Sequence, residues 1–247
     1  MSGHSKWHNI QARKSKVDSK RSKIFTKLIK EISVASKMGG SSIEGNSKLK
    51  DAIEKAQYNN IPKETIERAI KKGAGELSGD NYENLVYEGY GPFGVAVIVK
   101  TLTDNKNRTA GNVRHIFSKF SGNLGSSGCV SYMFKEVGEI VVDSSQDISE
   151  DEIMEIAFNC GADDFQTHES DNVYVIKSSV ENFRKIKEEL ESENVDFLEA
   201  EIRLQADTNV FLDSDEKINI IEKFIDALED DDDVQEVFCN AEYEIYN

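Results

Sequence analysis

The spacing of apolar residues changes near residue 80, and this change predicts a mixed α and β architecture. Before it, apolar side chains recur every three or four residues, as in Ile24–Ile32 and Ile66–Ile70, which is the spacing of amphipathic helices. After it, Leu85–Glu88 and Gly94–Val99 have the composition and the period of two expected for strands. At 247 residues the chain is long enough for two or three domains.

Three amphipathic segments predict a small helical domain in the first third of the chain. They lie at residues 13–37, 49–56 and 62–73. In the first, the apolar side chains from Ile24 to Ile32 fall on one face and the basic ones on the opposite face. Asn46 or Ser47 is expected to cap the second helix, and Pro62 suits the first turn of the third.

The rest of the chain alternates predicted strands and helices. The first hairpin leads into a helix over residues 106–120 and a strand over residues 129–134. Residues 137–204 then follow the order β-α-β-β-α-β of ferredoxin-like domains. The tail contains a helix over residues 216–228 and a strand over residues 234–239, which are too few elements for a core of their own. We therefore expect the tail to return to the first α/β unit.

These segments together predict an α+β fold. It consists of an N-terminal three-helix domain followed by two α/β domains, one of them ferredoxin-like. The expected boundaries are a basic arm over residues 1–20, a helical domain over 21–79, an α/β domain over 80–135 plus 205–247, and a ferredoxin-like domain over 136–204. The second domain is discontinuous because the tail rejoins it.

Charge is divided unevenly along the chain. Residues 1–80 contain 17 Lys and Arg against nine Asp and Glu, whereas the remaining residues contain 13 against 37. The first thirty residues alone contain nine basic residues and one acidic residue, in a protein of formal net charge -16. This pattern predicts a basic binding end and an acidic body that phosphate backbones avoid.

The basic residues of the first helix form a stripe. From Arg13 to Lys30 they recur every three or four positions, so a helix places them on one face, although charge alone also fits a solvated basic tail. We expect the stripe and its neighbours to bind phosphates, with Trp7 either stacking on a base or anchoring the arm to the helical domain. The candidate nucleic-acid-binding residues are Lys6, Trp7, Arg13, Lys14, Lys16, Lys20, Arg21, Lys23, Lys27, Lys30, Arg108, Arg114 and Lys119.

No combination of residues predicts catalysis. Gly89–Gly94 matches G-x-G-x-x-G, but Pro92 lies inside it and a strand follows where a dinucleotide site requires a helix. His4 and His8 lack the further nearby ligands of a zinc site, and Asp230–Asp233 is better explained as a solvated acidic loop than as a magnesium site. We therefore expect no enzyme activity, no cofactor and no metal.

Cysteine usage and hydropathy favour a cytoplasmic protein. The three cysteines are far apart and include no C-x-x-C pair, so neither disulfides nor a cysteine zinc site is expected. No apolar run approaches the roughly 20 residues of a membrane span, and the N-terminal residues lack the apolar core of a secretory signal. The sequence does not indicate the oligomeric state, and a monomer is the default expectation.

Several motifs in the chain resemble those of one known family. They are GHSKW (Gly3–Trp7), DSKRSKIFTKL (Asp18–Leu28), NNIPKETIERAIKKGAGE (Asn59–Glu76), YEGYGPFGVAVIV (Tyr87–Val99), TDNKNRTAGNVRHIF (Thr103–Phe117), LGSSGCVSYMF (Leu124–Phe134) and LEDDDDVQEVFCN (Leu228–Asn240). In this order and over the whole chain, they are similar to the YebC/PmpR family of probable transcriptional regulators. The resemblance implies a helical domain plus two α/β domains.

The resemblance implies nucleic acid as the partner and leaves its kind open. A transcriptional regulator would bind DNA. The family's mitochondrial relatives, which include the translational activator of cytochrome c oxidase, imply instead a ribosome-associated translation factor that contacts ribosomal RNA. No helix can be singled out with Arg, Asn and Gln arranged to read base edges, which weakens the promoter interpretation.

A third alternative is a protein-interaction module that uses the acidic ferredoxin-like domain, but it leaves the basic stripe unexplained. The acidic body would limit non-specific coating of nucleic acid. We also hypothesise that it folds back on the basic arm when no ligand is bound.

Overall fold

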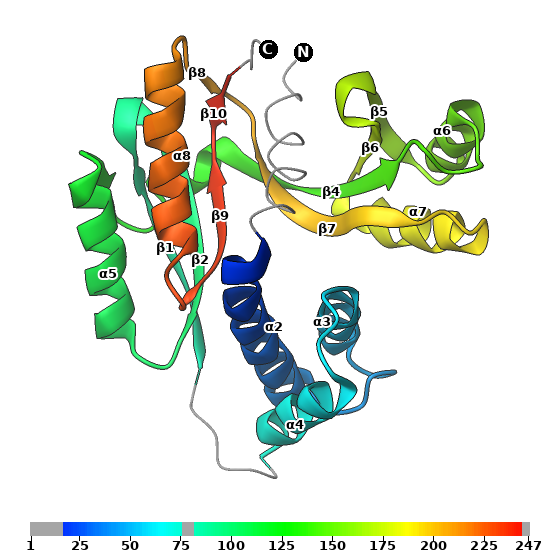
Figure 1. Cartoon of the computed structure of the whole chain (residues 1–247), viewed down its shortest axis with the longest axis horizontal. Helices are drawn as coiled ribbons and strands as arrows, with labels where there is room; N and C mark the ends of the chain where they lie inside the picture. The colour runs from blue at the N-terminus through cyan, green and yellow to red at the C-terminus, as the bar shows by residue number, and fades with distance from the viewer. Residues whose placement is uncertain (1–16, 76–81, 244–247) are drawn as a thin grey trace. The chain divides into compact units, whose positions relative to one another are not determined.

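The computed structural model describes residues 17–75 and 82–243, except for the side chains of residues 17–22 and 170. The described residues divide into two compact units (Figure 1). One unit runs to Val130 and takes in Ser214–Cys239, and the other covers Ser131–Asp213 and resumes at Asn240. The α+β fold class is confirmed, because helices come first and two sheet-containing regions follow. The domain boundaries expected from the sequence are finer than this division and stay a prediction.

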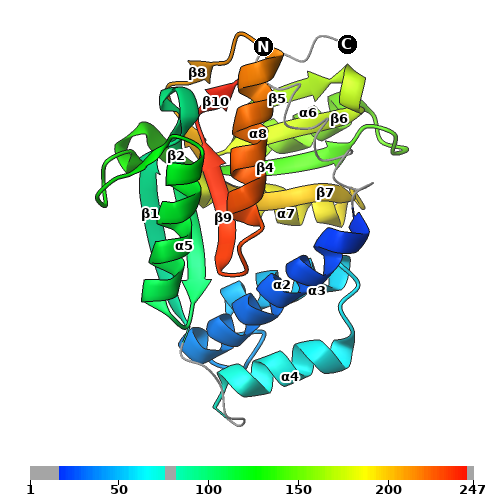
Figure 2. The ribbon, with the colours of Figure 1, turned by 60° about the vertical axis from the view of Figure 1, so that its left-hand side comes forward.

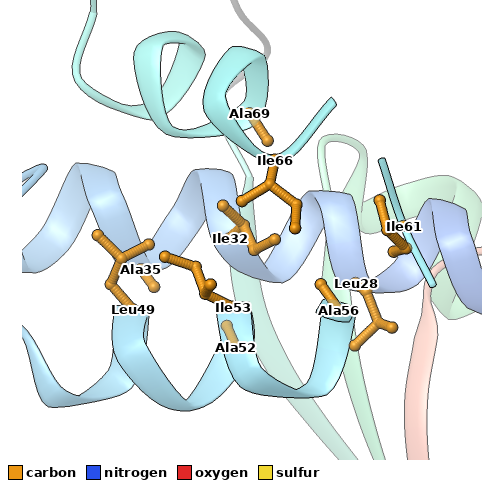
Figure 3. Close-up of a cluster of buried hydrophobic side chains, with 10 residues drawn as sticks. All are labelled: Leu28, Ile32, Ala35, Leu49, Ala52, Ile53, Ala56, Ile61, Ile66 and Ala69. Atoms are coloured by element: carbon orange, nitrogen blue, oxygen red, sulfur yellow. The ribbon is translucent and has the colours of Figure 1, made fainter. Parts of the chain in front are cut away.

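Three helices form the helical part of the first unit. They are α2 (Val17–Gly39), α3 (Ser47–Tyr58) and α4 (Lys63–Gly73). Their shared core consists of Leu28, Ile32, Ala35, Leu49, Ala52, Ile53, Ala56, Ile61, Ile66 and Ala69 (Figure 3). From the apolar face predicted for the first helix, this core includes Leu28 and Ile32, whereas Ile24 is 38% exposed. Helical spacing places the basic residues on the side away from the core.

Asn46 connects two of these helices. Its side-chain oxygen accepts a hydrogen bond from the Leu49 amide at 3.1 Å and so caps α3, which confirms one of the two predicted caps. Its side-chain amide donates to the carbonyl oxygens of Ala35 and Gly40, each at 2.8 Å. The same side chain therefore satisfies backbone groups at the start of one helix and near the end of another.

The first unit also contains a four-stranded sheet of order β3-β1-β2-β9. The strands of this sheet and the helices between them are β1 (Glu83–Tyr90), a short 3-10 helix (Pro92–Gly94), β2 (Ala96–Thr103), α5 (Lys106–Lys119), β3 (Asn123–Leu124), α8 (Asp215–Glu229) and β9 (Val234–Cys239). Helices α5 and α8 pack side by side against the sheet (Figure 2), where the rings of Phe117 and Phe224 meet edge to face with centroids 5.1 Å apart. In the tail, β9 pairs antiparallel with β2, whereas Asn240 and the described residues after it group with the second unit.

The strand predicted over residues 129–134 is wrong. Ser131–Met133 is a short 3-10 helix, and β4 begins at Phe134. The carboxylate of Glu88 accepts hydrogen bonds from the backbone amides of Gly128 at 2.8 Å and Val130 at 3.0 Å. Because a side chain binds these amides, they are not available to a strand ladder.

The second unit contains the ferredoxin-like sheet. Its elements are β4 (Phe134–Asp143), α6 (Glu150–Asn159), β5 (Ala162–His168), a short 3-10 helix (Glu169–Asp171), β6 (Val173–Ser178), α7 (Val180–Ser192) and β7 (Phe197–Ala206), with the short strands β8 (Val210–Phe211) and β10 (Ala241–Glu242) after them. The main strands are antiparallel in the order β5-β6-β4-β7. Ile140 and Ile176 of the sheet share a core with Ile153 of α6 and Ile186 of α7. The predicted β-α-β-β-α-β order is confirmed.

Gly73 lies where α4 closely approaches α2. A Cβ atom at this position would overlap the carbonyl oxygen of Ser33 and lie 2.8 Å from the Cβ of Ser36. We expect Gly73→Ala to lower the free energy of unfolding by about 1–3 kcal/mol, because α2 and α4 must move apart. Urea denaturation followed by circular dichroism measures this change.

The matched control is Gly111→Ala in α5, where an added Cβ meets no atom within 4 Å. This change is expected to raise the free energy of unfolding by about 0.5–1 kcal/mol, because alanine restricts the unfolded chain. Equal stabilities of the Gly73→Ala variant and the wild type would contradict the proposed close approach.

Candidate nucleic-acid interface

The structure describes part of the predicted interface. Five of the predicted residues lie outside the described part of the chain, namely Lys6, Trp7, Arg13, Lys14 and Lys16. Lys20 and Arg21 belong to α2, but their side chains are not among those described. The described side chains are those of Lys23, Lys27, Lys30, Arg108, Arg114 and Lys119. The site is therefore built from α2 and α5.

Lys23, Lys27 and Lys30, called the lysine face below, follow one another at one-turn intervals along α2. All three ammonium groups contact the segment Glu229–Asp233, called the acidic loop below, which leads from the end of α8 to β9. The lysine face and the acidic loop belong to the same compact unit. The described part of the basic stripe thus lies against the most acidic run of the chain.

Lys23 and Lys27 bind the first residues of the acidic loop, called its outer end below. Lys23 Nζ lies 3.1 Å from Asp230 Oδ1 and donates to the Asp230 carbonyl oxygen at 3.0 Å. Lys27 Nζ donates to the carbonyl oxygen of Glu229 at 2.7 Å. Glu229 is the last residue of α8, where the carbonyl groups carry the negative end of the helix dipole. The positions predicted to hold phosphates therefore hold oxygen atoms of the protein itself.

The inner end centres on Asp233, which is 3% exposed. Lys30 Nζ donates to the carbonyl oxygen of Asp232 at 2.8 Å and to Asp233 Oδ1 at 3.1 Å. Asp233 Oδ2 accepts hydrogen bonds from Arg108 Nη2 at 2.6 Å and from Thr109 Oγ1 at 2.9 Å. A buried carboxylate requires such charged and polar partners to be stable. Asp233 consequently connects α2 with α5.

These contacts change the pKa values of three groups. Burial raises the pKa of Asp233, but hydrogen bonds from Arg108, Lys30 and Thr109 outweigh it, so the net pKa lies below the ordinary value. The hydrogen bond to Asp233 also raises the pKa of Arg108. The pKa of Lys27 is lowered, mainly by burial, although the carboxylates of the acidic loop oppose this effect. The charged forms of Asp233 and Arg108 are therefore the ones that the fold favours.

The three predicted residues on α5 differ in their surroundings. Arg108 Nη2 lies 2.8 Å from Asp104 Oδ1 in addition to its contact with the acidic loop. Arg114 and Lys119 are exposed, and Lys119 Nζ lies 5.7 Å from the centre of the Phe120 ring. Arg114 and Lys119 thus present their charges to solvent, whereas Arg108 is bound to carboxylates.

The partners of the lysine face are not among the residues predicted for the interface, except for Arg108, which shares Asp233 with Lys30. The solvated loop expected at Asp230–Asp233 needs correction, because Asp230 and Asp232 are exposed but Asp233 is buried. Two further polar residues also bind the acidic loop: Asn112 Nδ2 donates to Asp231 Oδ2 at 2.8 Å, and Thr103 Oγ1 donates to Asp233 Oδ2 at 3.2 Å. The available signal was a basic row and an acidic run of opposite charge, far apart in the sequence.

Among the residues that the structure describes, no group of three or more His, Cys, Asp or Glu side chains is placed to hold a metal ion. Within the same residues, every helix is too short or too polar to cross a membrane. The oxygen atoms of the acidic loop bind lysine, arginine, threonine and asparagine side chains.

Comparison with known families gives two adjoining matches. Residues 82–241 match the family model described as the TACO1/YebC second and third domain. Residues 5–76 match the model described as the TACO1/YebC protein N-terminal domain. The two models together cover the helical part and both four-stranded sheets.

Similar proteins match the chain over nearly its full length. A probable transcriptional regulatory protein of Hathewaya histolytica is 57% identical over 243 residues, which is 98% of each chain. A probable transcriptional regulatory protein of Clostridium tetani is 56% identical and also covers 98% of each chain. A crystal structure of a conserved hypothetical protein from Aquifex aeolicus matches with a TM-score of 0.84 and 46% identity, covering 94% of both chains.

Replacing Asp233 with asparagine tests the role of its charge. We expect Asp233→Asn to lower the free energy of unfolding by about 3 kcal/mol, because Lys30 and Arg108 keep their charges and lose their common carboxylate. The control is Asp232→Asn, which changes an exposed side chain and is expected to alter stability by about 0.5 kcal/mol or less. Urea denaturation measures both, and equal losses would show that the charge of Asp233 has no special role.

The lowered pKa of Asp233 also predicts a pH dependence. A carboxylate whose pKa is lower in the folded state stabilises the fold above its unfolded-state pKa of about 3.9, and this contribution is lost as the pH falls below that value. We expect the free energy of unfolding to fall between about pH 5 and pH 3, and to fall less steeply in Asp233→Asn. Urea denaturation at stepped pH provides the test. Parallel pH curves for the two proteins would contradict this expectation.

Proposed function

The chain belongs to the TACO1/YebC family, and we propose that it is a regulatory protein that binds nucleic acid through the basic face of α2 and the basic residues before it. The proposed role is binding rather than catalysis, and it involves no cofactor and no membrane. A cytoplasmic location, expected from the sequence, is part of the proposal.

One observation carries the proposal: cations lie in a row along a helix whose opposite face is fixed in a core. Lys23, Lys27 and Lys30 recur at one-turn intervals, and in the sequence the same spacing extends back through Lys20 to Arg13. A row of this kind suits successive phosphates of a nucleic-acid backbone, because each cation faces the same direction. The helical core holds the row in place without using its charges.

We propose DNA as the first ligand, because similar bacterial proteins are named probable transcriptional regulatory proteins. Ribosomal RNA is the second candidate. Lysine contacts to phosphates do not depend on base sequence, so the same row of cations also fits an RNA backbone. A protein-interaction module is the third candidate and would leave the basic residues before Lys23 without a role.

Crosslinking in living cells, followed by sequencing of the bound DNA and RNA, separates these candidates. Enrichment of promoter DNA would support a transcriptional regulator, and enrichment of ribosomal RNA would support a translation factor. Recovery of neither nucleic acid would favour the protein-interaction module.

Removing Lys20, which belongs to the basic row, together with the neighbouring Arg21 tests the basic part of α2 that precedes the lysine face. We expect Lys20→Ala combined with Arg21→Ala to weaken binding to a short DNA duplex. The slope of log affinity against log salt should fall by about 2, because each lost phosphate contact removes about 0.9 from it. Fluorescence anisotropy at several salt concentrations measures both quantities, and a fragment of ribosomal RNA is titrated in parallel.

The matched control is Arg184→Ala combined with Lys185→Ala, which removes two adjacent exposed cations from α7 in the ferredoxin-like sheet region. Its affinity and salt slope should stay close to those of the wild type. Equal losses in the two double variants would show that net charge, and not the row on α2, governs binding.

A further inference from the structure

We infer that the acidic loop is an internal competitor, which nucleic acid must displace from the lysine face before that face can bind phosphates. The inference rests on the proposed function, since it concerns the same three lysines and adds the regulation of their site. It is carried by the contacts, exposure and attachment points of the acidic loop.

The acidic loop presents the kind of atoms that a phosphate backbone presents. From Lys23 to Lys30 the helix rises about 10 Å, and over this length the loop offers carboxylate and carbonyl oxygens to three ammonium groups in turn. The nitrogen-to-oxygen distances, 2.7 to 3.1 Å, are those of charge-assisted hydrogen bonds. A phosphate would need the same positions.

The loop also covers two of the three lysines that it binds. The Lys30 side chain is 13% exposed, and Lys27 is half-buried. A nucleic-acid backbone cannot reach a covered ammonium group without moving the atoms that cover it. The loop and a polyanion therefore compete for the lysine face instead of binding it together.

The two ends of the loop are held differently. At the outer end, the side chains of Lys23 and Asp230 are 39% and 55% exposed, so water and salt screen their attraction. At the inner end, the Asp233 side chain is 4% exposed and is also bound by Arg108. The outer end is therefore the part that opens, and the inner end keeps the loop attached to α5.

This arrangement sets a threshold for binding. The apparent affinity of a ligand is reduced by the fraction of molecules whose site is open, so a closed loop weakens every polyanion by the same factor. Only a ligand with several closely spaced phosphates recovers that loss, because it gains contacts to the basic residues before the lysine face as well. The closed loop lowers all affinities alike, and extended nucleic acid is the ligand whose additional contacts outweigh this loss.

Removing charge from the outer part of the loop tests the inference. We expect Asp230→Asn combined with Asp232→Asn in the full chain to bind a short mixed-sequence DNA duplex about three to ten times more tightly than the wild type at low salt. Both side chains are exposed, and Asp233 is left intact. Fluorescence anisotropy measures affinity, and thermal unfolding verifies that the variant is folded.

The matched control is Glu188→Gln combined with Glu189→Gln, which neutralises two exposed acids on α7. Its affinity should be that of the wild type. If the loop variant binds no more tightly than this control, the loop is a fixed structural contact and the inference is wrong.

Hydrogen exchange of the wild-type protein gives a second test that needs no variant. The amides of Asp230 and Asp231 donate to the carbonyl oxygens of Asp226 and Leu228. Saturating DNA should accelerate exchange at these two amides and leave the Leu102 amide, which donates to the Asp233 carbonyl oxygen, protected. Unchanged or slower exchange at Asp230 and Asp231 would overturn the inference.

The two proposals fail in different ways. If Lys20→Ala with Arg21→Ala binds DNA and ribosomal RNA as the wild type does, the proposed function fails. If that variant loses binding while the loop variant behaves like its control, the proposed function stands and only the competition by the loop is rejected.

Discussion

The hydrogen bonds and ion pairs of the Asp233 carboxylate are the interactions on which the first unit depends most. It binds Lys30 of α2 through one oxygen, and Arg108 and Thr109 of α5 through the other. The carbonyl oxygen of the same residue accepts a hydrogen bond from the Leu102 amide of β2 at 2.7 Å. One buried residue therefore meets the helical part, the sheet and a covering helix, and a loss at this point affects all three.

The segment that completes the first sheet also places the acidic loop. Strand β9 pairs with β2, and Phe224 of α8 packs on Phe117 of α5, so the two elements that flank the loop are fixed by core contacts. The position of the carboxylates opposite α2 is then a result of folding rather than of attraction between charges alone. The same pairing that stabilises the sheet thereby determines how accessible the lysine face is.

Local patterns were sufficient for most of the fold. The helical segments, the cap at Asn46 and the β-α-β-β-α-β order follow from residue spacing and turn chemistry within a few positions. The strand expected over residues 129–134 failed because Glu88, about 40 positions earlier, binds the amides of that segment. The partners of the lysine face were missed for the same reason, since Lys23 and Asp230 are 207 positions apart.

The ribosome synthesises the lysine face well before it synthesises the acidic loop that covers it. Helices α2, α3 and α4 bury a core of their own, so they can fold while the rest of the protein is still being synthesised. The acidic loop and β9 are made last among the elements of this unit. Until then the nascent chain carries uncovered cations close to the RNA of the ribosome that makes it, and the finished protein covers them itself.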